Sequence, residues 1–82
     1  MTKEDELIEH FLVVARRICG GCAPRFIGVK DELYIFDLGI KGRRAQWSFH
    51  GDLIDDSTKD RVRLRLLENA IKDAVRKSRM TP

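Results

Sequence analysis

The sequence predicts a small α+β fold in which two helices pack on one face of a three-stranded antiparallel meander. Near both ends of the chain, apolar residues recur at intervals of three and four, the spacing of an amphipathic helix. Between them, three short runs rich in β-branched and aromatic residues are separated by turn residues. The chain has 82 residues, so we expect one domain, residues 1–82, with a thin hydrophobic core.

We expect the first helix over residues 3–18, with Leu7 and Phe11 on its apolar face. Thr2 is a suitable N-cap because a threonine hydroxyl can accept a hydrogen bond from a free N–H of the first turn. The glycine pair at 20–21 is expected to end this helix, since glycine adopts the left-handed conformation at little cost.

Three strands are expected next, over residues 25–29, 33–38 and 43–50. In the third strand, Trp47 and Phe49 alternate with polar residues, a pattern typical of one buried and one solvated face. The second strand is apolar on both faces, which favours a central position in the sheet.

The last third of the chain predicts an acidic loop over residues 51–56 and a second helix over 57–78. Residues 62–66 alternate and also fit a strand, but the helical spacing that follows favours a helix throughout. The apolar stripe that this helix is expected to bury consists of Val62, Leu66, Leu67, Ala70, Ile71 and Ala74. Ser57 is expected to cap this helix. Residues 57–79 hold eight basic and three acidic side chains, whereas the net charge of the whole chain is only +3. A one-sided basic helix of this kind favours an anionic partner.

The central strand indicates a protein interface. If Trp47 and Phe49 face the helices, some apolar residues of the second strand must point away from them. An exposed apolar sheet face commonly marks an interaction site. We assign Tyr34 and Phe36 to such an interface, with either a second copy of the chain or another protein as partner. Leu33 and Ile35 are the alternative pair, and covering loops or termini are the alternative to an interface.

Cys19 and Cys22 form the one sharp local motif, Cys-Gly-Gly-Cys. The spacing suits half of a zinc site, which His10 and His50 could complete, and it also suits a dithiol redox motif. The histidines are not at zinc-knuckle spacing, and the motif closes a helix rather than opening one. We therefore expect a helix stop flanked by two small apolar residues, with reduced thiols and no metal or cofactor.

The order α-β-β-β-α resembles that of the double-stranded-RNA-binding domain. In that family, a lysine cluster before and within the first turn of the last helix grips phosphates. The matching stretch here, residues 51–60, is acidic and holds Lys59 alone, so the resemblance covers only the order of elements. A different basic surface remains as a candidate for binding nucleic acid or another anionic partner: Lys41, Arg43, Arg44, Arg61, Arg65, Arg76 and Arg79.

No set of catalytic residues is evident. Ser48 and His50 lie two residues apart, but the sequence signals no orienting acid and no oxyanion hole. We therefore expect a non-catalytic interaction protein that acts by protein–protein contact as an accessory subunit, regulator or inhibitor, such as phages and other mobile elements encode. An RNA- or DNA-binding module is the alternative. We expect a cytoplasmic protein, because the acidic N-terminus lacks signal-peptide order and no apolar run approaches the ~20 residues of a membrane span.

Overall fold

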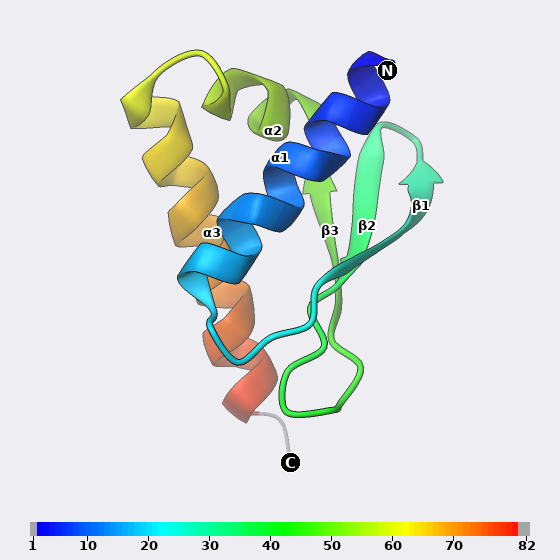
Figure 1. Ribbon diagram of the computed structural model, residues 1–82, viewed down its shortest axis with the longest axis vertical. Coiled ribbons are helices and arrows are strands. Elements are labelled where there is room, and N and C mark those ends of the chain that lie inside the picture. The colour runs from blue at the N-terminus through cyan, green and yellow to red at the C-terminus, as the bar shows by residue number, and fades with distance from the viewer. Residues whose placement is uncertain (1, 81–82) are drawn as a thin grey trace.

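The computed structural model describes the backbone of residues 2–80 and the side chains of residues 2–78. Its elements confirm the α+β class, with one helix more than the sequence predicts (Figure 1). The three strands form one antiparallel sheet in the order β1-β2-β3. The elements in chain order are α1 (Lys3–Ile18), β1 (Arg25–Lys30), β2 (Leu33–Asp37), β3 (Gln46–His50), α2 (Gly51–Ser57) and α3 (Arg61–Met80).

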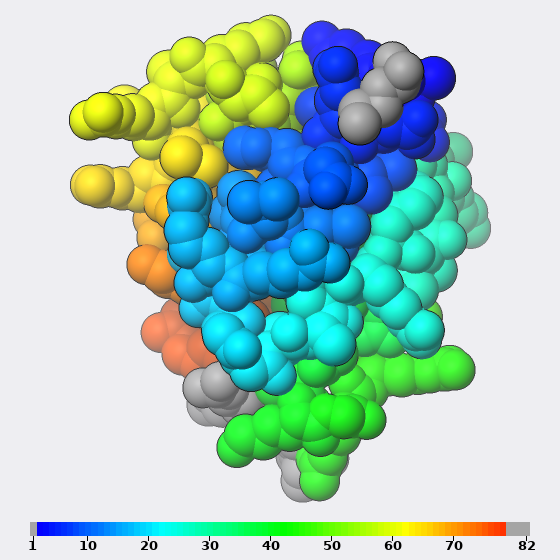
Figure 2. All heavy atoms as spheres, in the orientation of Figure 1, coloured from blue at the N-terminus to red at the C-terminus, as the bar shows by residue number. Residues whose placement is uncertain are grey.

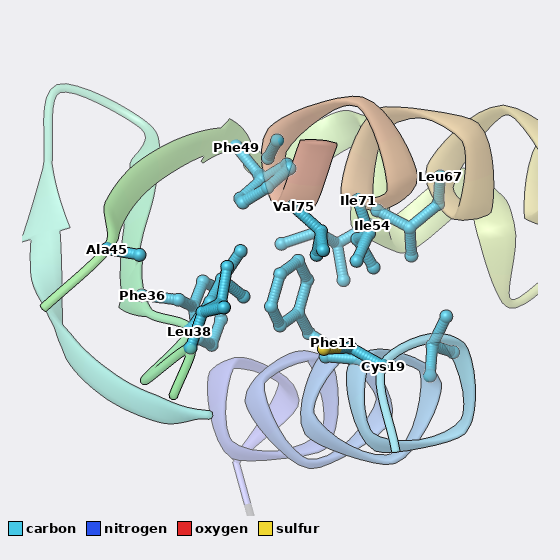
Figure 3. Packing of buried hydrophobic residues seen from close by; sticks show 14 of the residues in the cluster. Phe11, Cys19, Phe36, Leu38, Ala45, Phe49, Ile54, Leu67, Ile71 and Val75 are labelled. Carbon is cyan, nitrogen blue, oxygen red and sulfur yellow. The ribbon is translucent and has the colours of Figure 1, made fainter. Parts of the chain in front are cut away.

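Helices α1 and α3 lie on the same side of the sheet, and the core fills the space between the sheet and these two helices (Figures 1 and 3). The Phe11 ring projects from α1 and stacks on Phe36 of β2, with 3.8 Å between ring centroids. Phe49 of β3 packs against the same ring. From α3, Leu67 and Ile71 complete the core, and both are fully buried. Burial of this apolar surface is the main force that holds the helices on the sheet.

The strand register decides which side of β2 faces the helices. Phe36 pairs with Trp47 and Tyr34 with Phe49, so these four side chains share the helix-facing side. The assignment of Phe36 to a protein interface was therefore wrong, because its ring is 0% exposed in the core. Tyr34 is half-buried on that same side, so it is not part of the open face either.

The open face of the sheet carries the alternative pair. Leu33 and Ile35 alternate with the buried aromatic rings and are opposite His50 and Ser48 of β3. Leu33 is 38% exposed, and Ile35 is half-buried. The apolar part of this face therefore lies on β2, bordered by Gly28 and Lys30 on β1 and by polar side chains on β3.

A two-residue turn joins β1 to β2. Asp31 and Glu32 both have left-handed backbones, with φ angles of 51° and 66°. A tight hairpin needs this conformation because its twist matches that of the flanking strands. The Glu32 carbonyl also accepts a hydrogen bond from the Gly51 N–H at 3.0 Å, which fixes the turn against the start of α2.

The loop between β2 and β3 is longer than predicted. The third strand begins at Gln46 rather than at residue 43, and Arg43 makes only an isolated bridge with Ile40. The physical reason is a tight turn: the Arg43 N–H bonds the Ile40 carbonyl at 3.0 Å, and Lys41 and Gly42 have positive φ angles. The chain therefore forms a turn at these residues, and regular pairing of β3 with β2 begins only at Gln46.

The predicted acidic loop is instead helix α2. His50 caps it by accepting the Asp52 N–H at its Nδ1 atom, at 3.3 Å. Ile54 anchors the helix in the core and is fully buried. Ser57 therefore ends α2 rather than capping the next helix. Asp60 caps α3 instead, because its Oδ1 accepts the Arg63 N–H at 2.8 Å.

Both ends of α1 lie where the sequence places them, but only one is made as expected. The Thr2 hydroxyl accepts the Asp5 N–H at 3.2 Å, which confirms the cap. The C-cap is Cys19, with an extended backbone, and neither Gly20 nor Gly21 has a positive φ. The expected glycine stop was therefore wrong.

Candidate basic and apolar contact surfaces

The two cysteines form a disulfide, which corrects the expectation of reduced thiols. The end of α1 at Ile18 and the following turn bring the two Cα atoms to 5.4 Å, within the usual range for a disulfide. Both sulfurs are thereby consumed, so they cannot supply the thiolates that a zinc site requires. Helix α1 does end at the predicted position, but Cys19 and Cys22 are joined by a disulfide instead of being two free apolar side chains.

The two histidines do not join the cysteines. The Nε2 atom of His10 lies 2.9 Å from the Ser57 hydroxyl, and this contact ties α1 to α2. Burial, and then the nearby Arg17 guanidinium, lowers the pKa of His10. His50 caps α2 at another place in the fold. Within residues 2–80, no group of three or more histidine, cysteine or acidic side chains could hold a metal ion.

Tyr34 borders a shallow depression of about 470 Å³ between the start of α1, the β1–β2 turn and α2. Lys3 forms an ion pair with Asp55 at 3.2 Å within this lining. Burial, followed by the Glu4 and Asp55 carboxylates, raises the pKa of Tyr34. The side chain predicted for a protein interface thus lies at an acid-lined hollow.

Helix α3 has two apolar faces, and only one is used by the core. Leu67 and Ile71 are buried against the other helices. On a different face of the first two turns, Val62 is 72% exposed and Leu66 is 47% exposed. These two residues are four positions apart and therefore lie next to each other on the helix surface. The fold does not need this second apolar pair.

Three exposed arginines flank the exposed apolar pair. Arg61, Arg63 and Arg65 are all exposed, and none makes an ion pair with the described side chains. Figure 2 shows side chains at the start of α3, in yellow, projecting away from the body of the molecule. The first two turns of α3 therefore present a surface that is both apolar and strongly basic. We call Arg61, Val62, Arg63, Arg65 and Leu66 the α3 surface.

Farther along α3, the basic side chains are partly neutralised. Arg76 pairs with Asp73 at 2.9 Å, and Lys77 contacts the same carboxylate at 3.0 Å. These hydrogen bonds, from Lys77 first and then Arg76, lower the pKa of Asp73. Glu68 pairs with Arg17 of α1 at 3.2 Å. The side chain of Arg79 lies outside the described residues.

The predicted basic residues do not form one surface. The β2–β3 loop lies beside the C-terminal end of α3, where the Trp47 Nε1–H donates to the Ser78 hydroxyl at 2.8 Å (Figure 1). Arg61 and Arg65 are at the opposite end of this 20-residue helix, about 20 Å or more away at 1.5 Å per residue. Lys41, Arg43 and Arg44 therefore form a separate group from the arginines of the first turns.

Two members of the loop group line a second shallow depression of about 470 Å³, and Lys41 is not part of its lining. Arg43 and Arg44 border it, and Arg25 from the start of β1 joins them. We call these three side chains the arginine cluster. Arg25 was not among the residues predicted from the sequence, because it is far from residues 43–44 along the chain. Only strand pairing could have placed Arg25 here: it is opposite Asp37 in the β1–β2 register, and Asp37 is the last residue before the loop.

The prediction that Val62 and Leu66 belong to the buried stripe of this helix was wrong, because both side chains are exposed. The alternation of arginine with apolar residues over 61–66 is the sequence feature that could have indicated this exposed surface.

Comparison with known protein families, curated proteins and solved structures gives no match. Among the described helices, none is long and apolar enough to cross a membrane.

Proposed function

We propose that this protein is a non-catalytic interaction protein that binds another protein through the α3 surface. The observation that carries the proposal is the exposure of Val62 and Leu66, at 72% and 47%, beside three arginines that have no ion-pair partner among the described side chains. Contiguous exposed apolar residues rimmed by polar ones favour a protein contact site. The positive charge favours an acidic partner segment.

The partner chemistry follows from the arrangement. Val62 and Leu66 are spaced one helical turn apart, which suits the apolar anchors of an amphipathic segment. The arginine side chains beside them suit carboxylates, since the guanidinium fork can form two parallel hydrogen bonds to one carboxylate. We therefore expect an acidic amphipathic segment of a regulated protein, with this chain acting as accessory subunit, regulator or inhibitor.

Binding of RNA or DNA is the second candidate. Arg61, Arg65, Lys72 and Arg76 follow one side of α3, at helical spacing, and a row of cations along a helix can track phosphates. The exposed Val62 and Leu66 favour protein instead, because phosphate contacts require no apolar side chain. The expected cytoplasmic location stays a proposal, and a disulfide is more typical of oxidising compartments.

Two double variants distinguish the candidates. V62S/L66S removes the apolar anchors and keeps the charge, whereas R61Q/R65Q removes charge and keeps the anchors. All four side chains are exposed, so each substitution should change the free energy of unfolding by only about 0.5 kcal/mol or less. Each variant is used as affinity bait in lysate of the source cells and is titrated against 20-nucleotide single- and double-stranded RNA at near-physiological salt.

The proposal is supported if one protein is retained by the wild type, lost with both variants, and shown by cross-linking to contact α3 through an acidic segment. V13S is the matched control, because Val13 is another exposed apolar side chain, 52% exposed, on α1. Saturable RNA binding that V62S/L66S keeps and R61Q/R65Q loses would replace the proposal with the nucleic-acid candidate. Equal behaviour of all variants in both assays would refute both.

A further inference from the structure

We propose that the arginine cluster at the β2–β3 loop is a binding site for a phosphomonoester group, separate from the α3 surface. Arg25, Arg43 and Arg44 converge on one solvent-open depression, together with the backbone of Gly21 and Gly42. Figure 2 shows the cyan segment after α1 in contact with the green loop that holds two of these arginines. The site is thus built from two segments, residues 21–25 and 37–44, that are distant in sequence.

The loop that carries Arg43 and Arg44 is fixed by a network of hydrogen bonds. The Asp37 carboxylate accepts the Gly39 N–H at 2.9 Å and the Ala45 N–H at 3.1 Å, so one oxygen closes both ends of the loop. The Leu38 N–H also bonds the Ala45 carbonyl at 3.0 Å. A preorganised loop favours binding because less conformational entropy is lost when the ligand arrives.

The segment on the other side of the depression is fixed as well. The Ala23 N–H donates to the Gly39 carbonyl at 3.2 Å, and Cys22 forms an isolated bridge with Ile40. The Cys19–Cys22 disulfide closes the turn that precedes this contact. Gly39 has a φ angle of 57°, and an added Cβ there would lie 2.6 Å from the Ala23 carbonyl oxygen. Close approach of the two segments therefore requires glycine at this position.

The charge of the depression favours an anion with more than one negative charge. Three arginines line it against one carboxylate, Asp37, so the lining carries a net charge of +2. The Asp37 side chain is only 4% exposed, and its closest contacts are two N–H groups and Arg25, at 3.7 Å. Its negative charge is therefore largely compensated by its own neighbours. Arg43 and Arg44 make no ion pair with the described side chains, so both are available to a ligand.

The chemistry of these groups selects the ligand class. Guanidinium forks match the geometry of phosphate oxygens and form charge-assisted hydrogen bonds with them. A phosphomonoester is mainly a dianion above its second pKa of about 6, whereas a phosphodiester carries a single charge. The net charge of the lining therefore favours a monoester, whether it belongs to a free metabolite or to a phosphorylated side chain.

The test is a titration followed by ¹H–¹⁵N NMR spectra at constant ionic strength and pH 7.5. The probes are inorganic phosphate, phosphoserine and adenosine 5′-monophosphate, with dimethyl phosphate as the singly charged comparison. We expect saturable shifts of amides in residues 21–25 and 39–45 with the first three probes. Dimethyl phosphate should bind at least about tenfold more weakly, and the phosphoserine affinity should fall when the pH is lowered to 5. The preferred probe identifies the source of the phosphate.

R43Q/R44Q is the site variant, and R61Q/R65Q is its control with the same loss of charge on the α3 surface. We expect the affinity to fall roughly tenfold for each guanidinium removed from the depression and to change less than twofold in the control. The fold of each variant is verified in the same spectra. Shifts without saturation, equal losses in both variants, or equal affinity for dimethyl phosphate would overturn the proposal. These outcomes are separate from the test of the α3 surface, because that test measures capture of a protein partner and binding of RNA rather than amide shifts around the depression.

Discussion

Replacement of Asp37 should uncouple the β2–β3 loop from the sheet. The Oδ1 atom of Asp37 accepts two backbone hydrogen bonds, from Gly39 and Ala45, and the side chain is almost fully buried. In Asp37→Ala both N–H groups lose their acceptor, and a buried donor without a partner costs about 1–3 kcal/mol. We therefore expect the free energy of unfolding to fall by about 2–4 kcal/mol. An 82-residue domain has roughly 4–12 kcal/mol in total, so the variant should still fold.

Urea denaturation followed by Trp47 fluorescence measures this loss. With an m-value of about 1–1.5 kcal/mol/M, a loss of about 3 kcal/mol lowers the midpoint by about 2–3 M. Asp37→Asn is the matched variant, because its amide oxygen can still accept the two N–H groups although the charge is gone. It should lose only about 1 kcal/mol. A loss under about 0.5 kcal/mol in Asp37→Ala, or equal losses in the two variants, would refute the reasoning.

The contribution of the Asp37 charge can be tested by measuring the stability of wild type and Asp37→Asn as a function of pH. The Ala45 N–H, followed by that of Gly39 and the Arg25 charge, lowers the pKa of Asp37 in the folded protein. Because the folded pKa lies below the unfolded value of about 3.9, the charge stabilises the fold above about pH 4. This contribution disappears as the pH falls through the lowered pKa. The stability difference between wild type and Asp37→Asn should therefore narrow below pH 4, and a constant difference would contradict the assignment.

Two further substitutions test the core and the first hairpin. Phe11→Ala removes a fully buried ring that stacks on Phe36, so it should lower the free energy of unfolding by about 3–5 kcal/mol in thermal or urea melts. Val13→Ala, on the exposed side of α1, is the control and should change this free energy by about 0.5 kcal/mol or less. Glu32→Gly should raise the free energy of unfolding by about 0.5–1 kcal/mol, because glycine adopts the φ angle of 66° without the left-handed penalty. The urea midpoint should rise accordingly, and an unchanged or lower midpoint would contradict this account of the turn.

Local periodicity predicted most of the elements. The spacing of Leu7 and Phe11 defines the buried face of α1, and the alternation around Trp47 and Phe49 defines that of β3. Such patterns depend on residues that are neighbours in sequence, so they are visible without a structure. Residues 62–66 at the start of α3 also fit a strand, but the good helix formers that follow them favoured the helix.

The short helix α2 could not be predicted in this way. Its seven residues include three aspartates, which read as a solvated loop. A helix of this length has little stability of its own. Burial of Ile54 and the cap from His50 stabilise it, and both require the rest of the fold to be in place.

The candidate sites were predictable only in part, and the reason lies in long-range contacts. By itself, the sequence determined the α+β class, the basic character of α3 and the basic loop tip at Arg43 and Arg44. Only the tertiary structure decided which side of the all-apolar strand β2 is buried, because packing of Phe11 against Phe36 selects one of two equally apolar faces. Strand pairing likewise brought Arg25 to the loop. Composition and periodicity describe single elements, whereas a face or a site exists only once separate elements have packed together.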